Sequence, residues 1–298
     1  MQQKYVIVSI PIHIYTKVLT AIFTTIIILI GCGGCDLGSL DSNPSPVNDS
    51  IEEIAIVNKD EIVVATYNIL NGASVETLND GNREWLKNNY PQYVDNRLQK
   101  VLDVINYINP DILGIEEAHQ WELGEPSVVQ DVADSLGMNY FFGQSTNPDA
   151  GFCSVALFTK FEIIESENYP DHFTRAGCRV KIKMPNGKLI NVFLAHLDAK
   201  SQKTRISEAY FIVSDMEPFI DEFSIIMGDM NFVDPSTEAN VFHEEGWKHP
   251  LRAKQVIDHI WTSPSLKPYV RSWGTVPSKL TMDASDHTPV IDIIGFPE

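Results

Sequence analysis

The sequence predicts an α+β protein in which two mostly antiparallel β-sheets pack together and helices cover their outer faces. Short strand-like runs recur along the chain, helix-like segments fall between them without a regular strand–helix alternation, and no internal repeat is present. The chain has 298 residues, of which 44% are hydrophobic, so it can form one large domain or two small ones.

The N-terminus has the pattern of a secretory signal. Residues 1–17 carry only two charges, and every residue from Val18 to Ile30 is apolar or Thr. This apolar core is short for a final membrane anchor and suits a signal peptide. It ends in Leu-Ile-Gly before Cys32, which resembles a bacterial lipobox. We therefore expect a signal peptide over 1–31 and a lipid on Cys32; an uncleaved anchor and a plain secretory signal are the alternatives.

A polar segment follows the lipobox. Residues 32–58 are rich in Gly, Ser, Asn, Asp and Pro as far as Ser50, which predicts a flexible tether before a folded domain over 59–298. Export would place Cys153 and Cys178 in an oxidising compartment. They can form one disulfide or remain two buried thiols, and the sequence leaves both possibilities open.

The first half of the folded domain predicts two strands and two helices. Residues 62–69 are β-branched and strand-like, and 111–115 read as a short buried strand. Between them, apolar residues recur at helical spacing and Pro110 ends the helix; these residues are Leu98, Val101, Leu102, Ile105 and Ile108. Ser127 and Gln130 form a capping box for a second helix, which closes near Gly137.

The second half predicts more strands and one long helix. Strands are expected over 153–159, 178–184, 189–195, within 225–232, and over 256–263 and 289–295, and a helix over 203–221. The strands 178–184 and 189–195 are joined by Pro185-Asn186-Gly187, and Asn-Gly between two strands is a strong hairpin signal.

The stretch 225–232, Ile-Ile-Met-Gly-Asp-Met-Asn-Phe, carries the first candidate chemistry. Its apolar run predicts a buried strand, and Asp229 and Asn231 follow the run two positions apart. In an extended backbone such positions point to the same side. A carboxylate and an amide together suit a phosphate and metal site. An Asp-x-Asn sequence is also an ordinary turn former, so this motif alone decides nothing.

Other polar residues follow apolar runs, lie between apolar neighbours or stand just before a predicted strand. These residues are Asn68, Glu116 with Glu117, His196 with Asp198, Asp258, and Ser285 with Asp286 and His287. Each has a structural alternative, such as a capping carboxylate, a satisfied core histidine or a buried ion pair. Together they supply carboxylates for a hard cation, Asn and His donors for phosphoryl oxygens and a His–Asp pair for proton transfer. The set therefore predicts metal-dependent phosphoester hydrolysis.

Six of these motifs occur in a characteristic order. They are TYNI, ILGIEE, HLD, GDMN, IDHI and SDH, and they extend over about residues 62–295. In this order the chain resembles the endonuclease/exonuclease/phosphatase superfamily, which shares its fold with pancreatic deoxyribonuclease and neutral sphingomyelinases. The resemblance implies a four-layered α/β sandwich with two central sheets, flanking helices and an active site at one edge of both sheets.

The resemblance also implies roles for single residues. It makes Glu117 the main ligand of Mg²⁺, or of Mn²⁺, with Asn68 nearby and Asp286 completing the shell. It assigns the attacking water to Asp229, phosphoryl oxygens to Asn231, Asn68 and Arg175 (or Arg179), proton transfer or charge stabilisation to His196 and His287, and the orientation of an imidazole to Asp258. Two positions depart from the pattern. Glu116 stands in place of the usual Gln, which leaves open which glutamate binds the metal, and His259 replaces an aromatic residue.

We therefore expect a divalent-metal-dependent phosphoester hydrolase, either a phosphodiesterase, a nuclease or a phosphatase, held in the bacterial cell envelope by a lipid anchor and monomeric. Its substrate can be nucleic acid, a phospholipid head group or a small phosphorylated compound. The formal net charge of −18 argues against tight non-specific binding of long nucleic acid, which needs clustered Lys and Arg. The alternative is a non-catalytic surface binding protein with the same fold. The presence of Glu117, Asp229 and His287 disfavours it.

Overall fold

The computed structural model describes residues 61–73, 97–147, 153–250 and 256–295, which belong to one compact unit, Asn48–Glu298. The predicted signal peptide, Cys32 and the tether lie outside the described residues. In the described part of the chain, no helix has the length and apolar character that crossing a membrane requires.

The first sheet contains six strands in the order β10-β11-β1-β2-β4-β3. Their bounds are β1 Glu61–Asn68, β2 Ile112–Glu116, β3 Asn139–Gly143, β4 Val155–Thr159, β10 Val270–Thr275 and β11 Val290–Gly295. The β1–β2 pair is parallel, and the other neighbours pair antiparallel.

The second sheet contains five strands in the order β5-β6-β7-β8-β9. Their bounds are β5 Glu162–Asn168, β6 Ala176–Lys183, β7 Leu189–His196, β8 Ser224–Asp229 and β9 Asp258–Thr262. The β7–β8 pair is parallel, and the other neighbours pair antiparallel. The prediction of two mostly antiparallel sheets is therefore confirmed.

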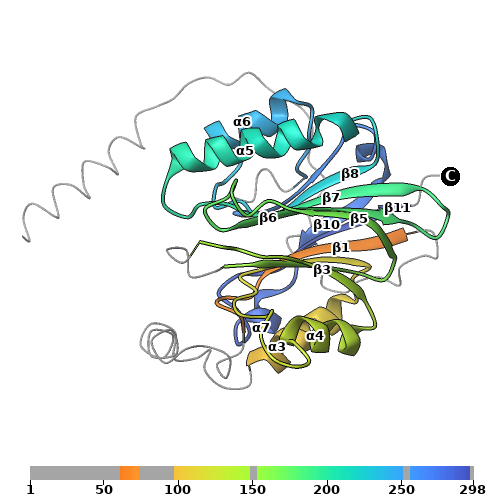
Figure 1. Ribbon diagram of the computed structural model, residues 1–298. Helices are drawn as coiled ribbons and strands as arrows, with labels where there is room; N and C mark the ends of the chain where they lie inside the picture. Colours follow the sequence, from red (N-terminus) through yellow and green to blue (C-terminus); the bar gives the residue numbers. More distant parts are fainter. Residues whose placement is uncertain (1–60, 74–96, 148–152, 251–255, 296–298) are drawn as a thin grey trace, which may run out of the picture. The chain divides into compact units, whose positions relative to one another are not determined.

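Helices cover the outer face of each sheet (Figure 1). The five-stranded sheet is covered by α5 (Gln202–Met216) and α6 (Thr237–Glu244), and the six-stranded sheet by α3 (Arg97–Ile108), α4 (Val128–Leu136) and the short α7 (Ser278–Thr281). Helix, sheet, sheet and helix form the four layers that the sequence led us to expect.

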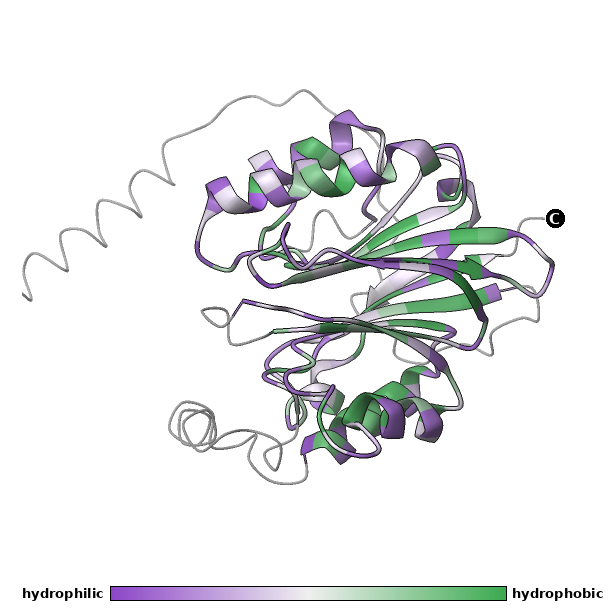
Figure 2. Cartoon of the chain, in the orientation of Figure 1, coloured by the Kyte–Doolittle hydropathy of each residue, from purple (hydrophilic) through white to green (hydrophobic). Residues whose placement is uncertain are grey.

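Hydrophobic residues are concentrated in the strands of both sheets (Figure 2). One cluster fills the space between the sheets and includes Val64 of β1, Leu194 of β7 and Ile260 of β9. Two further clusters pack the helices onto the outer faces. Polar side chains that emerge at the ends of the strands are thus held by rigid, buried elements on both sides.

The local signals in the sequence explain several element ends. Ser127 caps α4 by accepting a hydrogen bond from the Gln130 backbone N–H, and Gly137 ends that helix in the left-handed conformation with a φ of 65°. The turn at Gly187, with a φ of 79°, joins β6 to β7 as the Asn-Gly signal predicts.

The structure corrects the sequence-based assignment in two ways. The long helix ends at Met216 and not at 221, because Pro218 supplies no backbone N–H and the chain continues as a short 3₁₀ turn, Glu217–Phe219. Five elements were not predicted: β3, β5, α6, β10 and α7. Of these, β3, β5 and β10 lie at sheet edges, and their sequences NYFFG, EIIESEN and VRSWGT lack a clean apolar alternation.

Candidate active site

Strand register brings the polar strand ends together. In the five-stranded sheet, His196 at the end of β7 pairs with Asp229 of β8, and Asp229 pairs with Asp258 at the start of β9. In the other sheet, Asn68 at the end of β1 pairs with Glu116 of β2. The same edge of each sheet therefore carries candidate residues, as the family resemblance implied.

Asn68 connects the two sheets. Its Nδ2 donates to Asp229 Oδ2 at 2.9 Å and lies 3.4 Å from Glu117 Oε1. Its Oδ1 accepts the Leu70 backbone N–H at 3.0 Å, which fixes the orientation of the amide. The Asn68 Oδ1 keeps one further lone pair that could bind a cation. Its predicted metal role stays a prediction, and its observed role is to bridge two carboxylates.

Asp258 and His287 form a close pair. The Nδ1 of His287 lies 2.9 Å from Asp258 Oδ2 and 3.1 Å from Oδ1, and its Nε2 lies 3.9 Å from Asp229 Oδ2. Burial alone would lower the pKa of His287, but the Asp258 carboxylate raises it well above its ordinary value. The protonated imidazole is therefore favoured, and its Nε2 lies on the side of Asp229.

Asp229 is the centre of the site. It is 2% exposed, and His196 Nε2 lies 3.3 Å from its Oδ2, while the Asn231 backbone N–H donates to its Oδ1 at 2.9 Å. Burial raises the pKa of Asp229, but the two imidazoles and the Asn68 amide outweigh it and hold the pKa below its usual range. Asp229 is thus an anion that is suited to orienting groups around it.

His196 is fully buried beside this anion. Burial and the nearby Arg175 guanidinium lower the pKa of His196, so the ring is neutral at physiological pH. Within the described residues its Nδ1 has no hydrogen-bond partner. A buried polar atom without a partner is uncommon, and at a site edge it indicates a place for a bound group.

Glu117 lies at the mouth of the site. Its Oε1 lies 3.0 Å from Arg175 Nη1, and its Oε2 accepts the Asn71 backbone N–H at 2.7 Å. Burial raises the pKa of Glu117, but His196, Arg175 and the Asn71 N–H together lower it by more than burial raises it. The net pKa is below its ordinary value, so the carboxylate is ionised. Its backbone is left-handed, with a φ of 59°, a strained conformation for a residue other than Gly or Asn.

Glu116 points elsewhere, which bears on the first departure from the family pattern. Its side chain is fully buried, its Oε1 accepts the Thr66 hydroxyl at 2.5 Å, and its Oε2 has no partner among the described side chains and backbone. Burial raises the pKa of Glu116 well above its ordinary value. A neutral carboxylic acid has the shape of the usual Gln amide, so Glu117 is the better candidate for binding a metal.

The second departure, His259, fills the core. It is fully buried, its Nε2 donates to the Val256 carbonyl at 2.9 Å, and its ring stacks on His249 with 4.2 Å between centroids. It therefore replaces the aromatic residue of the pattern as a packing group on the helix-facing side of β9.

The structure separates the two candidate arginines. Arg175 contacts Glu117 and also lies 3.7 Å from the Cys153 sulfur. Arg179 instead pairs with Glu167 and Asp215, each at 2.9 Å, on the surface beside α5. Arg175 is thus the arginine that faces the site.

Asn231 lies in a turn, which corrects the extended backbone expected for Asp-x-Asn. The strand ends at Asp229, and Asn231 has a φ of 52°. Its Nδ2 donates to the Leu197 carbonyl at 3.0 Å, so at least one amide hydrogen holds the neighbouring loop. The predicted contact of Asn231 with a phosphoryl oxygen stays a prediction.

The SDH segment docks onto β1 through Ser285. The Ser285 hydroxyl donates to the Asn68 carbonyl at 2.7 Å and accepts the His287 backbone N–H at 3.2 Å. Asp286, between them, is exposed. Although the residue as a whole is exposed, partial desolvation of its carboxylate raises the pKa of Asp286, while His287 opposes the rise and the Glu117 carboxylate adds to it.

Sequence reasoning missed Glu208, a buried carboxylate on α5. Its Oε1 accepts the Thr174 backbone N–H at 2.8 Å, and its Oε2 accepts the Asp198 backbone N–H at 2.9 Å. It thereby joins the loop before Arg175 to the loop after His196. A charged residue on the apolar face of a helix is the one signal that could have identified it.

Asp198 itself has a structural role. Its Oδ1 accepts the backbone N–H groups of Lys200 at 2.8 Å and Ser201 at 2.5 Å, which shapes the turn before α5. Cys153 and Cys178, the cysteines of the described residues, are free thiols, and burial raises the pKa of each to about 12.

The donor set fits a hard divalent cation. Asp229, Asp258 and His287 converge within 4.8 Å, but a protonated imidazole is a poor ligand, so these three are better described as a proton-holding cluster. The carboxylates of Glu117 and Asp286 remain, and each carboxylate has lone pairs beyond those used in its hydrogen bonds. Oxygen ligands of this kind are the ones that Mg²⁺ and Mn²⁺ prefer.

The chain resembles several solved structures. The human Nocturnin catalytic domain with bound sulfate has a TM-score of 0.61 and 17% identity, covering 81% of this chain and 97% of that one. A Bacteroides thetaiotaomicron mannosyl-6-phosphatase has a TM-score of 0.59 and 18% identity, and the match covers 78% of this chain and 99% of that one. An endonuclease/exonuclease/phosphatase family protein from Bacteroides thetaiotaomicron has a TM-score of 0.59 and 19% identity, and the match covers 80% of this chain and 98% of that one. No curated protein matches the chain.

At these identities the solved structures show a shared fold. The sequence comparison goes further, because the model of the endonuclease/exonuclease/phosphatase family matches residues 65–287, a range that contains the end of β1, the strands from β2 to β10 and every polar residue described at the sheet edge. The chain is a member of the endonuclease/exonuclease/phosphatase family.

Proposed function

We propose that this protein is a divalent-metal-dependent phosphoester hydrolase whose active site lies at the shared edge of the two sheets. The observation that carries the proposal is the convergence of two imidazoles, His196 and His287, on the Asp229 carboxylate, beside the ionised Glu117. Phosphoester cleavage needs a positioned water, a stabilised phosphoryl charge and a proton for the leaving oxygen. These residues can supply each of the three.

In this proposal Glu117 and Asp286 hold the cation, which is Mg²⁺ or Mn²⁺. When bound, such an ion supplies positive charge to a phosphoryl oxygen and so stabilises the charge that develops there. Arg175, 3.0 Å from Glu117, adds a second positive group on the same side of the site. A mannosyl-6-phosphatase among the similar structures supports phosphate chemistry at this type of site.

The remaining residues manage protons and orientation. Three donors stabilise Asp229 as an anion, so it orients the attacking water and the imidazoles. Because the same donors lower its pKa, Asp229 is a weak base and does not keep a proton that it accepts. His287, held protonated by Asp258, can donate from Nε2 to a phosphoryl oxygen or to the ester oxygen that leaves. Water adds to phosphorus, the phosphorus–oxygen ester bond breaks, and the leaving oxygen takes the proton of His287; the proton that the water loses passes through Asp229 to His287 and restores both groups.

The proposal is tested by hydrolysis of bis(p-nitrophenyl) phosphate and p-nitrophenyl phosphate with the purified full chain. We expect turnover with Mg²⁺ or Mn²⁺, none after chelation with EDTA, and recovery when the metal is returned. The rate ratio for the two compounds assigns diesterase or monoesterase activity. A matched control is Asp131→Asn, a carboxylate in the first turn of α4 outside the site. Metal-independent turnover, or no turnover of any phosphoester in a panel of DNA, RNA, phospholipids and sugar phosphates, would overturn it.

We further propose that Cys32 carries a lipid that holds the domain at a bacterial membrane. The support is the Leu-Ile-Gly-Cys sequence directly after a short apolar core. One acyl chain binds membranes only weakly, so stable attachment requires more than one chain. Mass spectrometry of membrane-fraction protein should find diacylglyceryl-cysteine at the N-terminus. A mature chain that retains Met1 would contradict the proposal.

A further inference from the structure

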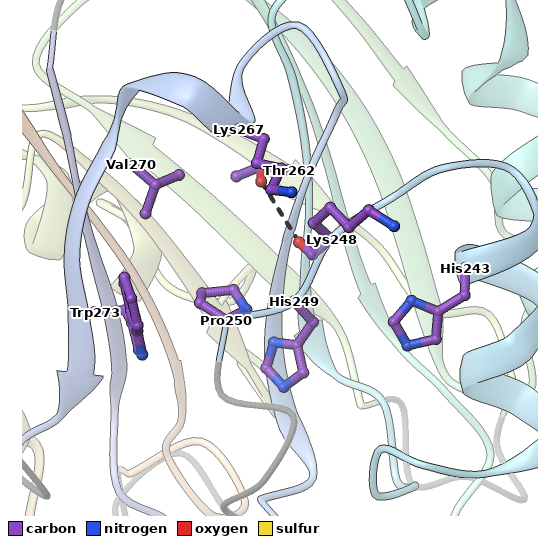
Figure 3. Close-up of a pocket in the computed structure, with 8 residues that line it drawn as sticks. All are labelled: His243, Lys248, His249, Pro250, Thr262, Lys267, Val270 and Trp273. Atoms are coloured by element: carbon purple, nitrogen blue, oxygen red, sulfur yellow. Dashed lines mark hydrogen bonds between the residues drawn. The ribbon is translucent and has the colours of Figure 1, made fainter. Parts of the chain in front are cut away.

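A pocket lies on the flank of the domain, away from the candidate active site. Its volume is about 440 Å³, within the range of small-molecule sites. The lining residues are His243, Lys248, His249, Pro250, Thr262, Lys267, Val270 and Trp273 (Figure 3). Thr262 belongs to β9 and Val270 and Trp273 to β10, which are edge strands of the two different sheets. The pocket therefore opens where the edges of the two sheets meet.

The frame of the pocket is held by backbone hydrogen bonds. The Lys248 N–H donates to the Thr262 carbonyl at 3.0 Å, and the Thr262 N–H donates to the Lys248 carbonyl at 2.9 Å. These two bonds fix the segment that carries Lys248, His249 and Pro250 along the free edge of β9. Figure 3 shows Val270 and Trp273 on one side of the pocket and His243 on the other. A site with fixed walls binds a ligand at a smaller entropic cost.

The two histidines are also fixed in place. His243 Nε2 lies 2.8 Å from Oδ2 of the buried Asp234, and His249 stacks on His259 with 4.2 Å between ring centroids. Because Asp234 holds the His243 ring and His259 holds the His249 ring, neither ring can rotate freely to fill the pocket. Side-chain packing on both sides of β9 therefore keeps the pocket open.

The charge of the pocket is unusual for this protein. Lys248 and Lys267 both line it, and neither makes an ion pair with another described residue. Its described lining contains no carboxylate, although the whole chain has a formal net charge of −18. Two uncompensated ammonium groups in a concave surface attract anions and repel cations.

The wall opposite His243 is suited to a ring. Trp273 is 39% exposed, which is high for the largest apolar side chain, and Val270 and Pro250 extend the apolar surface beside it. An exposed indole next to positive charge presents a flat face for stacking, and its burial by a ligand would be favourable. The lining therefore combines a cationic part with an aromatic part.

The pocket is separate from the candidate active site. Thr262 is four residues from Asp258 along β9, which corresponds to about 13 Å at the rise of a β-strand. Moreover, the pocket lies on the free edge of β9, whereas Asp258 faces His287 at the strand's opposite end.

From this arrangement we infer that the pocket is a second ligand site, which binds a small organic anion carrying a ring. Lys248 and Lys267 contact the carboxylate, sulfonate or phosphate group of the ligand, and the ring lies against Trp273. The inference does not depend on the proposed hydrolase activity, because none of the lining residues belongs to the catalytic cluster.

The test uses the full chain labelled with 5-fluorotryptophan and observed by ¹⁹F NMR. The Trp273→Phe variant assigns the Trp273 resonance. The probe is 1-naphthalenesulfonate, which has a ring and an anionic group but no phosphoester bond. We expect a saturable shift of the Trp273 resonance, affinity at least about tenfold lower for the neutral 1-naphthalenemethanol, and weaker binding in 0.5 M NaCl than in 0.05 M NaCl.

Two pairs of variants complete the experiment. The double variant Lys248→Gln/Lys267→Gln should weaken sulfonate binding by about tenfold, since each exposed charge pair contributes modestly. The control Lys183→Gln/Lys188→Gln removes the same charge from the β6–β7 hairpin and should bind as the parent does. His287→Ala should also leave the Trp273 shift unchanged. No saturable shift at Trp273, equal binding of the neutral probe, or loss of the shift in His287→Ala would overturn the inference.

Discussion

Asn68 Nδ2 donates a 2.9 Å hydrogen bond to Asp229 Oδ2, and this bond joins the end of β1 in one sheet to the end of β8 in the other. The two residues are 161 positions apart in the chain. Both are almost completely buried, so loss of this amide would leave the Asp229 carboxylate with one hydrogen-bond donor fewer in a desolvated place. The relationship makes Asn68 a direct determinant of the charge and position of Asp229.

The orientation of the Asn68 amide gives a first prediction. Asn68→Asp is isosteric but places a carboxylate against Asp229 and Glu117, so it should lower kcat/KM by at least about 100-fold, the cost typical of losing one preorganised donor. Asn68→Ala, which only removes the donor, should lose less. The Mg²⁺ dependence of the rates separates two roles. If Asn68 binds the metal through oxygen, Asn68→Asp should instead retain or increase the apparent Mg²⁺ affinity.

The two adjacent glutamates should behave differently. Glu117→Gln removes the ionised carboxylate at the mouth of the site and should abolish most activity at any Mg²⁺ concentration, because a hard cation prefers a charged oxygen ligand. Glu116→Gln should stay within about fivefold of the parent, since the buried Glu116 is held neutral and an amide oxygen can still accept the Thr66 hydroxyl. Steady-state kinetics over a Mg²⁺ series measures both. A larger loss for Glu116→Gln would move the metal role to Glu116.

His287 and Asp258 should act as one unit. His287→Ala and Asp258→Ala should each reduce kcat by about 10²–10⁴-fold, the usual contribution of a positioned acid–base group. The double variant should be little worse than the more severe single variant, because either change alone removes a protonated and oriented imidazole. Independent, multiplicative losses would show that the two residues contribute separately.

Glu208 should be a positioning residue for the site. Glu208→Gln retains one carboxamide oxygen for two backbone donors, so one of the N–H groups of Thr174 and Asp198 loses its acceptor. We expect a loss of about 1–3 kcal/mol in unfolding free energy, the cost of a buried unsatisfied group. Because Thr174 precedes Arg175, we also expect a rise in KM.

The control for Glu208 is Glu217→Gln, an exposed carboxylate just after α5. Kinetics should be measured at a temperature at which both variants are fully folded. An unchanged KM in folded Glu208→Gln would show that the residue stabilises the two loops without positioning Arg175.

Much of the site could be predicted because its residues follow apolar runs. Asn68 and His196 end strands, Glu117 directly follows one and Asp258 begins one, and the hydrophobic pattern of each strand is visible in the sequence. Their meeting could not be predicted from the pattern, since it depends on the register of β7, β8 and β9. A shift of one residue would turn each side chain to the other face of the sheet. The ordered family motifs supplied that information.

The features that sequence patterns did not reveal depend on how the chain packs and ends its strands. Glu208 accepts from a backbone group 34 residues away, so its role arises only when α5 packs on the sheet. Of the two alternatives for Asp-x-Asn, the extended backbone was wrong and the turn is what the structure has, because the strand ends at Asp229 and two-residue alternation does not extend into the turn. The edge strands β5 and β10 are half exposed and carry charged residues, so their hydrophobic pattern is weak.

Asp292 in β11 supports a prediction about pH. It is fully buried, and neither carboxylate oxygen has a hydrogen-bond partner within the described structure. Burial alone raises the pKa of Asp292 well above its ordinary value, so the folded protein holds this side chain neutral. The unfolded chain exposes an ordinary carboxyl group with a pKa of about 3.9.

The sign of the effect follows from proton binding. Below about pH 3.9 both states are protonated at Asp292, and the residue leaves stability unchanged. Above that pH the unfolded state releases the proton and the folded state keeps it. Stability therefore falls with rising pH, by at most about 1.4 kcal/mol per unit, until the raised folded-state pKa is reached. Asp292→Asn removes this penalty without changing the shape of the side chain.

We therefore expect Asp292→Asn to have a larger free energy of unfolding than the parent at pH 7. Near pH 4 the two free energies of unfolding should be nearly equal. Urea unfolding at pH 4, 5, 6 and 7, in EDTA so that metal binding does not contribute, measures the difference. Asp283→Asn, an exposed change beside α7, should follow the parent at every pH. A constant difference between Asp292→Asn and the parent across this range would mean that Asp292 is not neutral in the folded protein. A parent that is more stable than Asp292→Asn at pH 7 would mean that the carboxylate is charged and stabilised by a partner.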